Sequence, residues 1–120
     1  EHLETWGPRF AGLESLMGAD LEEIVARQWA ACVTSSDTAF SQISEDRVFP
    51  LKYEEFTADP IGCLARIMKW LNTVQDDQAL AMAATSVRAT SVGKGQALCG
   101  SLGPTTKTVL QAPMRAHGYW

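Results

Sequence analysis

The sequence predicts a mainly α-helical chain, an α/β fragment with about four or five helices and one main strand near 47–53. Two observations predict this fold class. In most of the chain, apolar residues recur every three or four positions, which is the period of a helix face. Only one stretch alternates apolar and polar residues with the period of a strand. With 120 residues, of which 46% are hydrophobic, we expect a single domain over 1–120 with one modest core.

The first long helix is expected to begin at Asp20, after an irregular, glycine-containing lead-in over residues 1–18. Asp20 and Glu23 form a start signal of the capping-box type. Apolar residues at spacing four then predict one apolar helix face from about 20 to 36 or beyond. The residues of this face are Leu21, Val25, Trp29 and Val33, with Ile24 and Cys32 beside them.

The single strand is predicted where the apolar period changes. Phe49, Leu51 and Tyr53 alternate with Val48, Pro50 and Lys52. Pro50 removes one backbone donor, which favours an edge position. A lone strand cannot satisfy its own backbone groups, so it needs a partner. The partner strands could be weaker segments of this chain ("SVRATSV" and "KTVLQ"), a second copy, or part of a missing N-terminal half.

Two helices are predicted after the strand. Asp59 followed by Pro60 is the N-cap and first-position pairing that starts helices. The apolar stripe of this helix is Ile61, Leu64, Ile67, Met68 and Leu71, of which we expect the last four to be buried, and Asn72 ends the helix. The second helix is expected from Asp76 to about Val87. Its inward side chains would be Leu80, Ala83, Ala84 and Val87.

The last part of the chain changes character at Arg88. The glycine-rich stretch "RATSVGKGQALCGSLGP", residues 88–104, predicts a loop of functional interest. A last helix is expected to follow, with Thr105 as its N-cap and a disturbance at Pro113.

The charge balance and the cysteines limit the function classes. The net charge is −4 and no basic block is present, which argues against nucleic acid or an anionic membrane as partner. No apolar run approaches the ~18 residues of a membrane span. The cysteines, Cys32, Cys63 and Cys99, are odd in number and widely spaced, which fits neither a disulfide framework nor a zinc site. A reducing compartment is therefore expected, and the cytoplasm is the predicted location.

No catalytic or metal-binding group of residues is predicted. Glu22 with Glu23, and Glu54 with Glu55, are adjacent pairs whose side chains point to different faces, so neither pair makes a carboxylate dyad. Cys99 and His117 could form a nucleophile–base pair in principle, but nothing local in the sequence supports it. We assign the polar string at Tyr53 to strand termination and local hydrogen bonding.

The segment "LKYEEFTADPIGCLARIMKWLN" resembles part of the sulfotransferase family that uses 3′-phosphoadenosine 5′-phosphosulfate (PAPS). In that family a core strand ends in an Arg-Tyr-Glu-Asp-Leu-like string, and an Asp-Pro then opens a helix that closes with an aromatic residue and Leu. Lys52, Tyr53, Glu54, Glu55 and Phe56 occupy the string here. An upstream helix with a Trp, the loop "SVGKGQ" and the tail "RAHGYW" follow the family order, so the resemblance spans most of 20–120.

The resemblance implies the C-terminal half of a P-loop-like fold and a role in closing over the 3′-phosphate of the nucleotide. Gly93, Lys94 and Gly95 match the end of the family's Arg-Lys-Gly string, with Gly93 in place of the Arg, and Arg88 is expected to join them. Glycines let backbone amides approach a phosphate, and Lys adds a point charge. PAPS, or its product 3′-phosphoadenosine 5′-phosphate (PAP), is therefore the expected nucleotide, bound weakly. An ordinary surface turn is the alternative.

The resemblance also shows what the sequence lacks. No Walker-like glycine-rich loop is followed by Lys-Ser or Lys-Thr, and the family's catalytic base is not carried onto His2. A sulfotransferase-like protein or fragment, inactive alone, is thus one functional hypothesis. The other is a non-catalytic helical module that self-associates or binds a protein partner. Pairing of the exposed strand edge at Val48, Phe49 and Leu51 predicts a homodimer, to which Trp6 and Trp120 would add apolar area.

Overall fold

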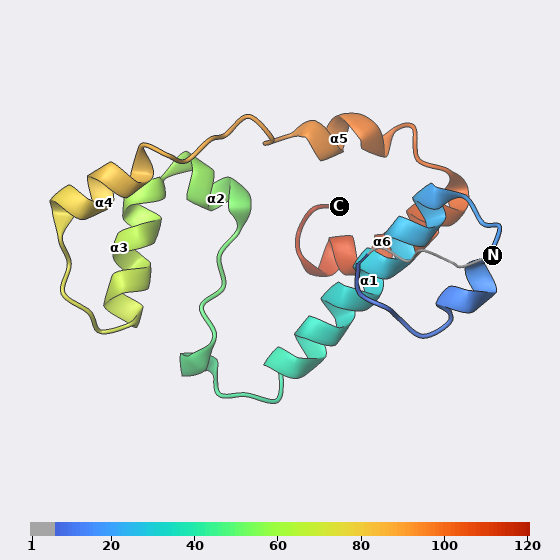
Figure 1. Ribbon diagram of the computed structural model, residues 1–120, viewed down its shortest axis with the longest axis horizontal. Coiled ribbons are helices and arrows are strands. Elements are labelled where there is room, and N and C mark those ends of the chain that lie inside the picture. The colour runs from blue at the N-terminus through green and yellow to red at the C-terminus, as the bar shows by residue number, and fades with distance from the viewer. Residues whose placement is uncertain (1–6) are drawn as a thin grey trace. The chain divides into compact units, whose positions relative to one another are not determined.

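A computed structural model describes residues 7–120, and Trp6 and His2 lie outside the described residues. The described part is mainly helical, as expected, and contains no strand (Figure 1). Its elements are the short 3-10 helices η1 (Leu13–Leu16) and η2 (Glu45–Arg47), and the α-helices α1 (Leu21–Phe40), α2 (Tyr53–Ala58), α3 (Pro60–Trp70), α4 (Asp77–Ala84), α5 (Lys94–Cys99) and α6 (Pro104–Ala116).

The chain divides into two compact units. Unit 1 joins the chain before Ser44 to Leu98–Trp120, and unit 2 is the segment Ser44–Ala97 between them. The sequence of unit 1 is therefore discontinuous, with unit 2 inserted into it. The expectation of a single domain stays a prediction.

In unit 1, α1 packs against α6, although the two helices lie at opposite ends of the sequence. Glu22, in the first turn of α1, accepts a hydrogen bond from the backbone N–H of Gly103, which precedes α6. Asp37, near the other end of α1, contacts His117 just after α6. The beginnings of the two helices thus lie together and so do their ends, which means that α1 and α6 run parallel.

In unit 2, α3 packs against both α2 and α4. The predicted start of α3 is confirmed: Asp59 is the N-cap, its side chain accepts from the N–H of Gly62, and Pro60 is the first helical residue. Asp76 caps α4 in the same way and accepts from two backbone N–H groups. The buried apolar residues of this unit are Cys63 and Leu80.

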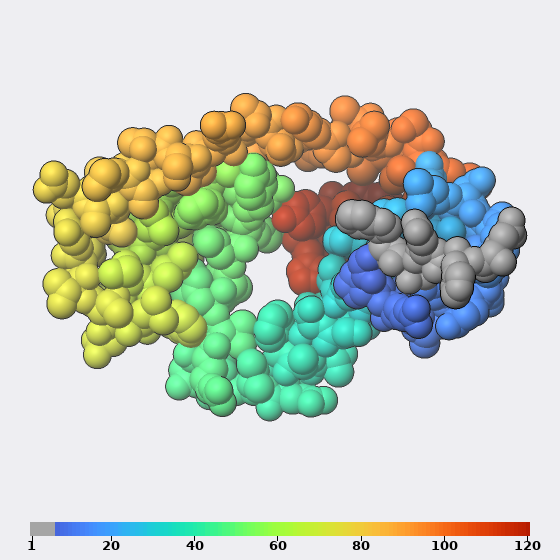
Figure 2. Space-filling model, in the orientation of Figure 1, coloured from blue at the N-terminus to red at the C-terminus, as the bar shows by residue number. Residues whose placement is uncertain are grey.

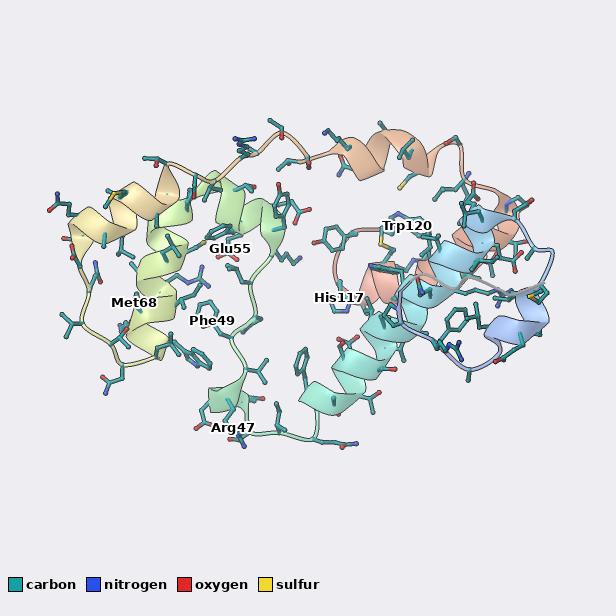
Figure 3. The ribbon with its side chains drawn as sticks, viewed as in Figure 1. Arg47, Phe49, Glu55, Met68, His117 and Trp120 are labelled. Atoms are coloured by element: carbon teal, nitrogen blue, oxygen red, sulfur yellow. The ribbon has the colours of Figure 1, made fainter. Side chains whose placement is uncertain are left out.

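The strand predicted near 47–53 is wrong. η2 ends at Arg47, and α2 begins at Tyr53. The backbone between them is extended at Val48 (φ −124°, ψ 121°) but has no hydrogen-bonded neighbour strand. The alternation instead brings Phe49 beside α3, where its ring centroid lies 5.6 Å from that of Trp70 (Figure 3). The pattern therefore indicated extended backbone correctly, but this segment packs against a helix.

The buried faces of α3 and α4 also differ from the expectation. Leu64, Ile67 and Met68 of α3 are only half-buried and Leu71 is exposed, while Cys63 is the buried residue. On α4, Leu80 is buried as predicted. Ala83 is exposed, and Val87 lies beyond the helix. Each helix is covered on a narrow side by short neighbours, so only one position in each becomes fully enclosed.

The region predicted as a loop over 88–104 instead contains a short helix, α5. α6 begins at Pro104, with Gly103 rather than Thr105 at the N-cap position. Pro113 lies inside α6, which continues to Ala116. Proline has no N–H, so it removes one backbone hydrogen bond. This loss falls in the last turn and does not end the helix.

Candidate functional site

The most distinctive surface of unit 1 is a row of large apolar side chains on α1 that stay partly exposed. Leu21, Val25 and Trp29 follow one another at spacing four, and Phe40 lies three turns beyond Trp29 on nearly the same side of the helix. Their exposed fractions range from 37% to 74%. We call these four residues the α1 stripe. Figure 2 shows the C-terminal half of α1, in turquoise, at the surface.

The α1 stripe corrects the predicted core face of α1. Ala26, and none of the large apolar residues, is the buried residue of this helix. Glu22, Ala26 and Asp37 lie on one side of α1, and the outer two of them contact the ends of α6. The small side chain of Ala26 lies between the contacts of Glu22 and Asp37 with α6, and it lets the two helices approach closely. Leu21 and Val25 point to the neighbouring side of α1, and Trp29 lies at the edge of the packed side, where it is 37% exposed. Phe40 lies beyond the contact of Asp37 with His117, past the end of α6.

The outward side of α6 is polar, in contrast to the α1 stripe. Lys107, Gln111 and Arg115 follow one another at spacing four and are all exposed. The residue of α6 that is buried is Thr106, which hydrogen-bonds to Glu22. α6 thus has one packed side and one solvated side, as a surface helix normally does, whereas on α1 exposed apolar residues continue next to the packed side.

The contacts of Glu22 with the start of α6 change the pKa of its carboxyl group. The hydrogen bond from Thr106 lowers the pKa of the Glu22 carboxyl below its usual 4.5, and the N–H of Gly103 and the charge of Lys107 lower it further. A carboxylate whose pKa is lower in the folded than in the unfolded chain stabilises the fold above its unfolded-state pKa. That stabilisation is lost as the pH falls through the folded-state pKa.

We therefore expect Glu22→Gln to make the stability of the chain less dependent on pH between about pH 5 and pH 3. The measurement is the midpoint of denaturant unfolding at several pH values, at one fixed protein concentration. Glu14→Gln, on the exposed η1, is the control and should keep the wild-type slope. Identical slopes for wild type and Glu22→Gln would contradict a stabilising role of this carboxylate.

The predicted nucleotide-binding residues lie around the start of α5. Gly93 has a positive φ of 78° and forms the turn before the helix, while Lys94 and Gly95 are the first two residues of α5. Arg88 lies between α4 and α5, and its carbonyl accepts a hydrogen bond of 3.0 Å from the hydroxyl of Tyr53. This bond agrees with the hydrogen-bonding role assigned to Tyr53, although Tyr53 begins a helix and ends no strand.

The backbone around Lys94 uses much of its hydrogen-bonding capacity internally. The N–H of Lys94 donates to Ser91, and those of Gln96 and Ala97 both donate to the carbonyl of Gly93. A phosphate cradle needs several such amides directed at the ligand. The turn therefore offers a phosphate fewer backbone donors than its glycines suggested.

Two further polar residues of unit 1, His117 and Cys99, have separate surroundings. His117 contacts the carboxylate of Asp37 through Nε2, at 3.0 Å (Figure 3). Cys99 lines a shallow hollow of about 400 Å³ with Lys107 and Trp120. The structure thus gives His117 a carboxylate partner and lends no support to a Cys99–His117 pair. A second hollow of about 290 Å³ separates η1 from Arg27 and Val109 and is mainly apolar.

Within residues 7–120, no three His, Cys, Asp or Glu side chains are grouped so that they could hold a metal ion. None of the helices in that part of the chain is both long and apolar enough to span a membrane. Comparison of the chain with known protein families, with curated proteins and with solved structures found no match.

Proposed function

We propose that this chain is a non-catalytic helical module that binds another polypeptide through the α1 stripe. The observation that carries the proposal is the exposure of Leu21, Val25, Trp29 and Phe40 along one helix. Isolated exposed apolar residues are ordinary, but several of them along one helix are typical of an interaction surface. An amphipathic helix that presents such a row is also a common element of peptide and helix recognition.

The burial elsewhere in the chain supports the same proposal. Among the described residues, the fully buried apolar side chains are Ala26, Cys63 and Leu80. Two of them are small, so hydrophobic burial within each unit is limited. Complete burial of a large apolar side chain that was fully exposed contributes roughly 1.5–3 kcal/mol. A partner on the α1 stripe would therefore add stability as well as affinity.

A matched pair of variants tests this function. Val25→Glu places a charge in the α1 stripe, whereas Val74→Glu makes the same change at a site on unit 2 that is 90% exposed. We expect the immobilised full chain to retain one polypeptide, or a differently tagged copy of itself, in a stoichiometric amount. Val25→Glu should lose that polypeptide and Val74→Glu should keep it. The same captured set for all three proteins would refute the proposal.

A second candidate, a sulfotransferase-like fragment, is favoured by the bond between Tyr53 and Arg88. This bond connects the string that resembles the family with the first residue of the glycine-rich stretch, 35 positions away. Under this hypothesis Gly93, Lys94 and Gly95 would hold part of the 3′-phosphate of PAP. One lysine and a few backbone donors should give only weak binding, on the order of high micromolar to millimolar.

Titration calorimetry with PAP tests the second candidate. Binding should weaken with added salt, be lost in Lys94→Ala and persist in Lys107→Ala. No binding at millimolar PAP, or equal binding by Lys94→Ala, would leave the turn without a nucleotide role. Under either hypothesis we expect no sulfuryl transfer from PAPS to a phenol or sugar acceptor above a heat-killed control.

A further inference from the structure

We propose that the polypeptide covering the α1 stripe is a second copy of this chain, joined through a two-fold interface. The inference rests on the proposed function and names its partner. The homodimer expected from the sequence was based on an exposed strand edge, which the described residues do not contain. The α1 stripe supplies a different and helical basis for the same assembly.

The charges of α1 support a self-complementary interface. α1 carries four charged residues, and each has a partner within its own unit. Glu23 and Arg27 form an ion pair, and Glu22 and Asp37 are tied to the two ends of α6. The α1 stripe therefore presents no unpaired charge of its own helix to repel an identical surface. It equally lacks a charge that would select a basic or acidic partner.

The size of the α1 stripe fits a standard interface. From Leu21 to Phe40 it runs for about 29 Å along the helix. From their exposed fractions, and about 150–250 Å² for an aromatic side chain, the four side chains expose roughly 400 Å² per copy. A standard interface buries about 800 Å² per partner, of which slightly more than half is apolar. The α1 stripe thus supplies the apolar centre, and polar neighbours supply the rim.

The parallel α1–α6 pair also suits this assembly. Two copies joined through α1 would place two such pairs side by side, an arrangement related to a four-helix bundle. The polar side of α6, with Lys107, Gln111 and Arg115, would then remain in solvent. A two-fold interface uses the same patch on both copies and therefore closes at two.

Sedimentation of the full chain tests the dimer. The wild type should change from its monomer mass of 13.1 kDa toward twice that mass as its concentration rises from about 5 to about 300 µM. Leu21→Glu should remain monomeric over this range, with at least about tenfold weaker association. Leu21 is the first residue of α1, where the helix dipole favours a carboxylate, so this variant should keep its fold.

The valine pair is the matched control. Val25→Glu should dissociate like Leu21→Glu, and Val74→Glu should dimerise like the wild type, with equal helical circular dichroism in all of them. A wild type that stays monomeric at the highest concentration, or equal dissociation of the two valine variants, would overturn the dimer. If a monomeric wild type still captured a different polypeptide through the α1 stripe, the second copy would be refuted and the proposed function would stand. A wild type that neither dimerised nor captured another polypeptide would refute both the dimer and the proposed function.

Discussion

Replacing Ala26 by aspartate should separate α1 from α6 and unfold unit 1. Ala26 is only 5% exposed and lies on the side of α1 that faces α6. The charged residues of α1 on that side, Glu22 and Asp37, are themselves carboxylates and cannot form an ion pair with the new carboxylate. Burying an unpaired charge costs several kcal/mol, and we expect a loss of at least about 3 kcal/mol. This is a large part of the total stability of a small domain.

Denaturant unfolding at one fixed protein concentration, with amide exchange resolved along the chain, measures this loss. Ser35→Asp introduces the same side chain at an exposed position of the same helix and should cost less than about 1 kcal/mol. Amides of α1 and α6 should lose protection in Ala26→Asp. Equal stability of the two variants would mean that Ala26 does not lie in a packed interface.

In unit 2, Leu80→Ala is expected to lower the free energy of unfolding by about 2–5 kcal/mol. Leu80 is 7% exposed and is the one large aliphatic side chain that the described residues enclose. Truncation removes its hydrophobic transfer energy and leaves a cavity between α4 and its neighbour α3. Cys63 is the other fully buried apolar residue described in this unit, so little other burial compensates for the lost stability.

Met82→Ala is the control for Leu80→Ala. Met82 lies two residues further along α4 and is 68% exposed, so its truncation should change stability by less than about 0.5 kcal/mol. Unfolding of both variants is followed by circular dichroism in denaturant. Similar effects of the two substitutions would show that the enclosure of Leu80 contributes little to the fold.

The features predicted correctly are those that nearby residues determine. The start of α3 follows from Asp59 and Pro60 because a cap and a fixed φ act over three or four residues. The predicted strand failed because a strand also needs a neighbour, and local alternation indicates only extended backbone. The segment at Phe49 has that backbone, but it packs against α3.

The candidate site could not be predicted for a related reason. Periodicity shows that α1 has an apolar face, but it does not show which side of the helix meets another element. The contact between α1 and α6 depends on polar ties at Glu22 and Asp37, whose partners lie about 80 residues away. Small residues such as Ala26 were the only local hint of the packed side. The glycines near Lys94 suggested a phosphate loop, but they introduce a short helix.

The parallel pairing of α1 with α6 has a consequence for the order of events during synthesis. α1 leaves the ribosome well before α6, with which it pairs. Residues 41–103 lie between them, which takes several seconds at about 5–20 residues per second. All of unit 2 emerges in that interval and can fold from contacts within itself.

Until α6 arrives, the nascent α1 exposes both of its sides. Closing a loop of this length also carries an entropic cost that grows with the logarithm of its length, about 4 kcal/mol before any constant term. Contacts between distant segments slow folding for this reason. The α1–α6 pair can therefore form only after the whole of unit 2 has been synthesised.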